Sequence, residues 1–197
     1  MKNQITLDRR EVVAQILKER GDTLVVTGLG STCWDAAAAG DDPRNFYVWG
    51  AMGGASMIGL GLALAQPTRR VLVITGDGEM LMGLGSLATV AVQQPVNLSI
   101  VVIDNEHYGE TGMQDTHTRS GVDLAGIAKA AGFPYSTRVD TEKELQALIP
   151  SLYRTNGPTF AVVKVMARSY PTVLPARDGT YLKNRFREAV LGKAATA

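Results

Sequence analysis

The sequence has only one cysteine, Cys33, so no disulfide can form within the chain. Its first residues lead into a polar pattern rather than the apolar core of a secretion signal. No apolar run reaches the roughly 18 to 20 residues that cross a bilayer, because proline, glycine or charge interrupts each run first. These absences predict a soluble protein of the reducing cytoplasm. Since no histidine lies near Cys33 in sequence, we expect a buried thiol rather than a nucleophile.

The chain also lacks an excess of either charge. Its 20 Lys and Arg against 19 Asp and Glu give a formal net charge of +1. The basic residues form no stripe or cluster of the kind that binds a phosphate backbone. We therefore expect neither nucleic acid nor a membrane as a partner. A small molecule or another protein chain is the expected partner.

Five short apolar runs rich in Val and Ile are the main positive signal. They alternate little, which is typical of parallel strands buried on both faces. The runs cover 24–27, 46–49, 71–75, 98–103 and 160–165. Helix-like stretches separate them, so the order predicts an α/β fold: an open, mainly parallel sheet with helices on both faces. With 197 residues, 45% of them hydrophobic, the chain is expected to form a single domain over 1–197.

The helical stretches differ in how deeply they should pack. Asp8 with Glu11, and Thr141 with Glu144, form capping-box patterns ahead of amphipathic helices, the first ending at Gly21. Stretches 53–66 and 80–94 are apolar on nearly every side, so each is predicted to be a deeply packed helix. The tail, 167–197, begins with a proline-rich segment and ends in a short helical pattern. We expect this tail to pack on a partner chain.

Two strand ends carry the chemistry. Run 71–75 leads into Gly76-Asp77-Gly78-Glu79, and run 98–103 leads into Asp104-Asn105-Glu106-His107. Ligands of open parallel sheets bind at such ends, where loop amides and helix N-termini converge. Gly76 and Gly78 let backbone amides approach a phosphate, while Asp77 and the amide oxygen of Asn105 are hard donors of the kind that hold Mg²⁺.

These segments resemble the signature of thiamine-diphosphate-dependent enzymes, which begins Gly-Asp-Gly and most often ends Asn-Asn. Asp104 replaces the first Asn, but the second, the metal-binding one, is intact as Asn105. The resemblance implies thiamine diphosphate and Mg²⁺ as cofactors. It also implies that the metal ligands are Asp77, Asn105 and the backbone carbonyl of His107.

Upstream segments extend the resemblance to further cofactor contacts. The segment Trp49-Gly50-Ala51-Met52-Gly53-Gly54 is similar to the one that meets the aminopyrimidine ring. There a glycine carbonyl, at Gly50, accepts the 4′-amino group, and a bulky residue, at Met52, holds the cofactor bent. The resemblance also assigns cofactor contacts to the loop residues Ser31, Thr32, Gly76, Gly78 and Glu79.

Over nearly the whole chain, to about Val165, the resemblance is greatest to the beta subunits of two-subunit sulfopyruvate decarboxylases, with phosphonopyruvate decarboxylases similar. It rests on segment 46–65 and on segment 108–114, Tyr-Gly-Glu-Thr-Gly-Met-Gln. It implies a lyase that decarboxylates a small 2-oxo acid to an aldehyde. The glutamate that such enzymes need lies on a separate pyrimidine domain, for which this chain has no place. An alpha subunit is therefore expected, in a hetero-oligomer with two of each subunit or a multiple.

Further catalytic candidates lie in segment 106–121, a long polar loop of the kind that often covers an active site. Glu110 is a candidate proton donor and His117 a candidate attractor of an anionic substrate, although both also fit ordinary surface positions. Three alternatives stay open: a carboligase or acyl-transferring subunit, a non-catalytic subunit that keeps the fold, and a nucleotide-dependent oxidoreductase. The last is disfavoured because Cys33 replaces the third glycine of the dinucleotide fingerprint.

Overall fold

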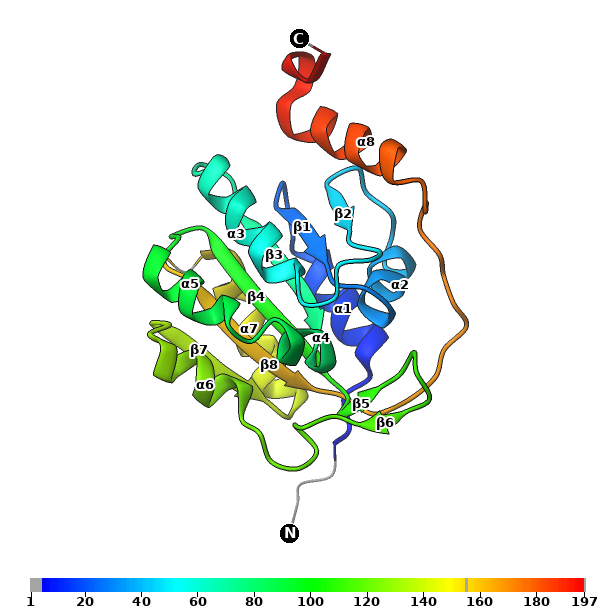
Figure 1. The fold of residues 1–197 in the computed structure, drawn as a ribbon, viewed down its shortest axis with the longest axis vertical. Coiled ribbons are helices and arrows are strands. Elements are labelled where there is room, and N and C mark those ends of the chain that lie inside the picture. Colours follow the sequence, from blue (N-terminus) through cyan, green and yellow to red (C-terminus); the bar gives the residue numbers. More distant parts are fainter. Residues whose placement is uncertain (1–4, 155, 197) are drawn as a thin grey trace.

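The computed structural model describes residues 5–154 and 156–196 and contains a six-stranded parallel sheet (Figure 1). The strands follow the order β2-β1-β3-β4-β8-β7 across it. Their bounds are β1 Leu24–Thr27, β2 Asn45–Tyr47, β3 Val71–Gly76, β4 Leu98–Asp104, β7 Tyr135–Val139 and β8 Thr159–Lys164. The predicted open α/β fold is confirmed. No helix in the described part of the chain is long and apolar enough to cross a membrane.

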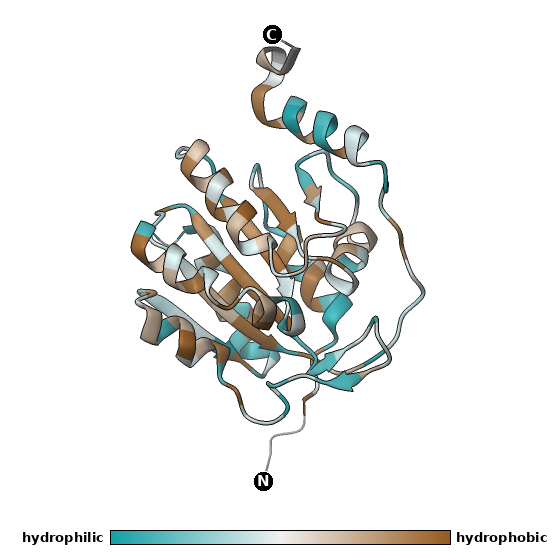
Figure 2. Cartoon of the chain, viewed as in Figure 1, coloured by the Kyte–Doolittle hydropathy of each residue, from teal (hydrophilic) through white to brown (hydrophobic). Residues whose placement is uncertain are grey.

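Helices cover both faces of the sheet and create two apolar cores. Alternate strand residues point to opposite faces, so Val25, Leu72 and Val101 contribute to one core, whereas Val26, Val73 and Val102 contribute to the other. The first core is closed by α1 (Arg9–Lys18), α2 (Ser31–Ala38) and α7 (Glu142–Arg154). The second is closed by α3 (Ala55–Ala65), α4 (Asp77–Met82), α5 (Ser86–Gln93) and α6 (Leu124–Ala131). Figure 2 shows the hydrophobic colouring concentrated in the central strands and α3.

The strand order contains a reversal that positions the site. From β1 the chain passes through α2 to β2 on one side, and after α3 it returns to β3 on the other side of β1. The connections after β1 and β3 therefore diverge, and such a switch point leaves a crevice at the carboxyl ends of the strands. β4 follows β3 in the sheet, so three strand ends meet there.

The Asp8 cap and the full Thr141–Glu144 capping box are present. The Asp8 side chain accepts hydrogen bonds from the amides of Arg10 and Glu11 at the start of α1. At the start of α7, the Glu144 amide donates to the Thr141 hydroxyl at 3.3 Å, and the Thr141 amide donates to the Glu144 carboxylate at 3.0 Å. These pairs satisfy amides that have no partner within the helix.

The prediction of one helix over 80–94 is wrong, because the chain breaks between α4 and α5. A Cβ at Gly83 would lie 2.3 Å from the carbonyl oxygen of Gly53, so two backbone segments touch where a continuous helix would carry side chains. The sequence patterns also failed to predict helices α2 and α6 and strand β7. β7 is a largely exposed edge strand, and α6 follows an Asp123 cap.

The tail folds back over the first strands of its own chain. Residues 166–178 run along the outside without regular structure, and α8 (Gly179–Leu191) follows, then a short 3-10 helix, Gly192–Thr196 (Figure 1). Phe186 packs on Phe46 of the β2 segment with ring centroids 5.3 Å apart, and Arg185 pairs with Asp41. The tail thus contacts its own domain. Its packing on a partner stays a prediction.

Candidate functional site

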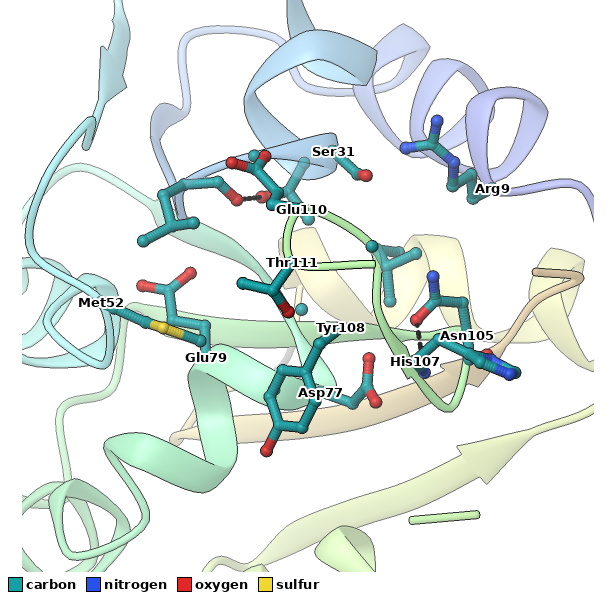
Figure 3. Close-up of a pocket in the computed structure, with 17 residues that line it drawn as sticks. Arg9, Ser31, Met52, Asp77, Glu79, Asn105, His107, Tyr108, Glu110 and Thr111 are labelled. Atoms are coloured by element: carbon teal, nitrogen blue, oxygen red, sulfur yellow. Dashed lines mark hydrogen bonds between the residues drawn. The ribbon is translucent and has the colours of Figure 1, made fainter. Parts of the chain in front are cut away.

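A pocket of about 240 Å³ lies at the switch point, where β1, β3 and β4 end (Figure 3). Its walls come from the start of α2, the β3–α4 junction, the segment after β4 and one residue of the segment before α3. The predicted residues that line it are Ser31, Thr32, Met52, Gly76, Asp77, Gly78, Glu79, Asn105, His107 and Glu110. The fold therefore gathers residues that are up to 79 positions apart, from Ser31 to Glu110.

Asp77 begins α4 directly after β3 and is 2% exposed. Its Oδ2 accepts hydrogen bonds from the hydroxyls of Thr116 and Thr118. Burial and the nearby carboxylate of Asp104 raise the pKa of Asp77 to about 6. A carboxylate that is costly to ionise in this position is stabilised by a cation beside it.

Asn105 follows β4 and lines the same pocket as Asp77 (Figure 3). Its Oδ1 accepts the His107 amide at 3.0 Å, and the His107 ring Nδ1 lies 2.7 Å from the Asn105 carbonyl. These two contacts hold a tight turn in which Glu106 adopts φ +64°. An amide oxygen has two lone pairs, so Asn105 keeps acceptor capacity for a metal. The oxygen donors present fit Mg²⁺, which prefers carboxylate and carbonyl ligands.

Glu79 is a buried carboxylate that joins three segments at the pocket wall. It accepts the Thr75 hydroxyl at 2.9 Å and the Ala55 amide at 3.4 Å. Burial raises its pKa, while hydrogen bonds from Thr75 and from the amides of Ala55, Leu29 and Gly53 lower it. A Cβ at Gly28 would lie 1.6 Å from its Oε2, so only glycine fits there. The assignment of Glu79 to the cofactor loop stays a prediction, because its oxygens bind protein groups.

Ser31 and Thr32 lie in the first turn of α2, where helix amides have no partner within the helix and favour an anion. The preceding Gly30 adopts φ +72°, which glycine tolerates at no steric cost. The Thr32 hydroxyl donates to the Gly28 carbonyl at 3.0 Å, whereas Ser31 is only half-buried and lines the pocket. Cys33, next in the helix, is fully buried, and burial raises its pKa to about 12, as expected of a core thiol.

The segment predicted to face the aminopyrimidine ring forms one end of the pocket. Met52 is 36% exposed and lines it, with its sulfur beside Glu79 in Figure 3. Gly50 is exposed and is not among the residues that line this pocket in the described chain. Met52 lies at the rim of the pocket. The cofactor contacts predicted for Gly50 and Met52 would therefore be made at this rim.

Segment 106–121, predicted to be a long polar loop, includes a short regular element. It contains an antiparallel ribbon of β5 (His107–Tyr108) and β6 (Gln114–Asp115). The connecting turn uses positive φ angles at Gly112 (+117°) and Met113 (+62°). The Tyr108 ring packs over Gly78, where a Cβ would lie 2.5 Å from the ring carbon Cε1. The ribbon thus closes one side of the pocket.

The structure separates the two catalytic candidates of this segment. Glu110 lies at the turn of the ribbon and lines the pocket, close enough to Gly30 that a Cβ there would lie 2.2 Å from its Oε1. Partial burial raises the pKa of Glu110. His117 is exposed, beyond β6, and is not among the residues that line this pocket in the described chain. Of the two, only Glu110 lines the pocket.

Several residues of the site carry no signal in the sequence. Arg9 reaches the pocket from α1 and is held by Asp35 of α2 at 2.9 Å. Thr116 and Thr118 follow the ribbon and hydrogen-bond to Asp77. Lys164 ends β8 and pairs with Asp104 and Glu106. A threonine or lysine far along the chain has no motif spacing, so only the fold reveals these contacts.

Comparison with known proteins gives consistent matches. Residues 28–163 match the family described as thiamine pyrophosphate enzyme, C-terminal TPP binding domain. The chain is 40% identical over 186 residues to sulfopyruvate decarboxylase subunit beta of Methanothermobacter thermautotrophicus, which spans 94% of this chain and 97% of the relative. Phosphonopyruvate decarboxylase of Streptomyces viridochromogenes is 37% identical over 174 residues, 86% of this chain and 42% of that protein.

Solved structures agree on the fold. The crystal structure of benzoylformate decarboxylase from Polynucleobacter necessarius superimposes with a TM-score of 0.71 at 21% identity. The match covers 87% of this chain and 36% of that one, so the fold seen here corresponds to about a third of the larger chain.

Proposed function

Because this chain belongs to the thiamine pyrophosphate enzyme family, we propose that it is the cofactor-binding subunit of a thiamine-diphosphate-dependent 2-oxo acid decarboxylase. The observation that carries the proposal is the pairing of Asp77 and Asn105 in one pocket at adjacent strand ends. Its support from relatives is the 40% identity to a sulfopyruvate decarboxylase beta subunit over 97% of that subunit's length.

Asp77 and Asn105 are the side chains that would hold Mg²⁺, with the backbone carbonyl of His107 as a third ligand. Both side chains line the pocket and offer oxygen atoms, which is the donor type that Mg²⁺ prefers. Gly76 and Gly78 flank Asp77, and the first turn of α2 with Ser31 lies opposite. This arrangement suits a diphosphate, because backbone amides and a helix N-terminus stabilise phosphate oxygens.

Thiamine diphosphate, when bound, supplies an electron sink for the electron pair left by loss of carbon dioxide from a 2-oxo acid. The chain's own contribution is to bind and orient. Met52 limits the pocket at the end away from Asn105, and the ribbon over Gly78 excludes water from the side. Glu110 holds a carboxyl group at the pocket, and its raised pKa favours a proton on that group, as a proton donor requires.

The pocket calls for a second chain to complete it. Its volume of about 240 Å³ is below the roughly 300 to 1,000 Å³ typical of ligand sites, and Met52 at its rim is partly exposed. The relative in M. thermautotrophicus is named a beta subunit, which supports an alpha-subunit partner. We propose that this partner carries the catalytic glutamate, in an assembly with two of each chain.

The proposed substrate class is a small 2-oxo acid with a second anionic group. Sulfopyruvate is the first choice, since the relative that matches at full length acts as a sulfopyruvate decarboxylase subunit by name. Phosphonopyruvate is the second candidate, because a decarboxylase named for it is 37% identical over 86% of this chain.

The decisive experiment follows carbon dioxide release from the purified chain with thiamine diphosphate, Mg²⁺ and each of sulfopyruvate, phosphonopyruvate and pyruvate. We expect no turnover from the chain alone, and turnover that rises with added alpha subunit and saturates near equal amounts. Asp77→Ala should abolish Mg²⁺-dependent cofactor binding, measured by calorimetry, while the protein stays folded. Full turnover without a partner, or unchanged cofactor binding by Asp77→Ala, would contradict the proposal.

A further inference from the structure

Lys164 is a buried cation that lies beside the proposed metal-binding loop. It is the last residue of β8 and pairs in register with Asp104, the last residue of β4. Its Nζ lies 2.8 Å from Asp104 Oδ2 and 2.7 Å from Glu106 Oε1. The Lys164 and Asp104 side chains are each 3% exposed. A buried charge is tolerated only when it is paired, so these groups depend on each other.

Two threonine hydroxyl groups lie between this ion pair and Asp77. Asp104 Oδ1 accepts the Thr118 hydroxyl at 2.8 Å, and the Thr118 and Thr116 hydroxyl oxygens are 2.9 Å apart. The Thr116 hydroxyl in turn donates to Asp77 Oδ2. Asp77 and Asp104 therefore both contact the Thr118 hydroxyl, and Lys164 pairs with the other carboxylate oxygen of Asp104.

The same contacts shape the turn that presents Asn105. The Glu106 amide donates to Asp104 Oδ1 at 3.0 Å, and the Glu106 carbonyl accepts the Thr116 amide at 2.9 Å. Lys164 forms ion pairs with Asp104 and Glu106, the residues on both sides of Asn105. Arg119 adds a longer contact to Glu106 at 3.8 Å from a half-exposed position.

We propose that Lys164 is a positioning residue for the metal site, and this rests on the proposed function of Asp77 and Asn105. Its ammonium group offsets the charge of Asp104, so that Asp104 can lie next to Asp77 without repelling it from its place. It also holds Asp104 and Glu106 in the turn that directs Asn105 into the pocket. Without Lys164, the carboxylates of Asp104 and Glu106 lose their shared cation, and the turn loses its anchor.

A double-mutant cycle tests this pairing in the complex with the alpha subunit. The variants are Lys164→Met, Asp104→Asn and the double variant, and Lys143→Met on the exposed face of α7 is the matched control. The readouts are the Mg²⁺ concentration that half-saturates thiamine diphosphate binding, measured by calorimetry, and the melting temperature without ligand.

Lys164→Met should raise the half-saturating Mg²⁺ concentration about tenfold or more, within the coupling expected of residues in direct contact. The double variant should recover part of this loss, because the uncharged amide that replaces the Asp104 carboxylate needs no cation, whereas Glu106 keeps its charge. Lys143→Met should change neither readout. Parental Mg²⁺ dependence in Lys164→Met, or a double variant as weak as Lys164→Met, would overturn the proposal.

Two further outcomes are informative. If Lys164→Met does not fold, recovery of folding by adding Asp104→Asn supports the charge pairing, and no recovery contradicts it. If the parent shows no Mg²⁺-dependent cofactor binding, the proposed function fails. The melting temperatures of the four proteins of the cycle then still report whether Lys164 and Asp104 are coupled.

Discussion

Asp77 combines two properties that set how the metal-free protein responds to pH. It is 2% exposed, and burial with the neighbouring Asp104 carboxylate raises its pKa to about 6, from the usual value near 3.8. The folded state therefore binds its proton more tightly than the unfolded state does. The stability gained from that proton is fully present below about pH 4 and is lost as the pH rises through about 6.

We expect Asp77→Asn to remove this contribution. With EDTA present, the melting temperature of the parent minus that of Asp77→Asn should fall as the pH is raised from 4 to 7. Circular dichroism melts at each pH measure it. Melts with saturating Mg²⁺ and thiamine diphosphate are the control, in which the parent should gain over the variant at pH 7. A difference that does not vary with pH in EDTA would contradict the raised pKa.

Met52 is expected to matter more for turnover than for cofactor capture. It lies at the pocket end away from Asn105, whereas Asp77 and Asn105, the proposed metal ligands, line another part of the pocket (Figure 3). Met52→Ala should lower kcat about 10- to 100-fold, the scale of a misoriented reactant, while the Kd for thiamine diphosphate stays within about threefold.

Met57→Ala is the matched control, because Met57 is similarly exposed, at 41%, but is not among the residues that line the pocket. Steady-state kinetics of the reconstituted enzyme and calorimetry make the comparison. Parental turnover in Met52→Ala would exclude the orienting role.

The contact between the 49–54 segment and the α4–α5 junction places the rim of the pocket. At this contact Gly83 meets the Gly53 carbonyl, and a Cβ at Gly83 would lie 2.3 Å from that oxygen. Gly53 itself adopts φ +85°, a conformation that glycine adopts readily. At this point the backbones of the two segments are in direct contact, with no side chain between them.

Gly83→Ala should force them apart and destabilise the protein by about 1 to 3 kcal/mol, the usual cost of overpacking. It should also weaken cofactor binding, because the displaced segment carries Met52. Gly85→Ala is the control: a Cβ there meets no atom within 4 Å, so its unfolding free energy should stay within about 1 kcal/mol of the parent. Urea denaturation measures both. Equal unfolding free energies for Gly83→Ala and the parent would show that the two segments can separate slightly without loss of stability.

The assembly as a whole is expected to contain two copies of this chain and two of the alpha subunit. An open pocket needs a covering chain, and two-fold symmetry is the simplest closed arrangement of paired subunits. Native mass spectrometry of the co-expressed complex should give a 2:2 composition or a multiple of it. A 1:1 complex with full activity would contradict the predicted 2:2 composition. It would leave intact the proposal that each active site needs one copy of this chain and one alpha subunit.

The order of strands and helices follows directly from local signals in the sequence. The buried runs at 24–27 and 98–103 contain little but Val, Ile and Leu, and β1 and β4 match them to within one residue. The Asp8 and Thr141 caps begin α1 and α7, because a side-chain oxygen next to free helix amides is a local interaction. Exposed β7 was missed for the opposite reason, since an edge strand needs no apolar pattern.

The Gly-Asp-Gly and Asp-Asn motifs identify Asp77 and Asn105 as candidate metal ligands from the sequence alone, since each motif lies within a few residues of a strand end. Tertiary contacts decide the rest of the site. The helix over 80–94 breaks because Gly83 meets Gly53, 30 residues away. His117 lies outside the pocket and Glu110 inside it, because the ribbon turns at Gly112. Lys164 reaches Asp104 and Glu106 only because β8 lies next to β4, a neighbour relation that local sequence does not encode.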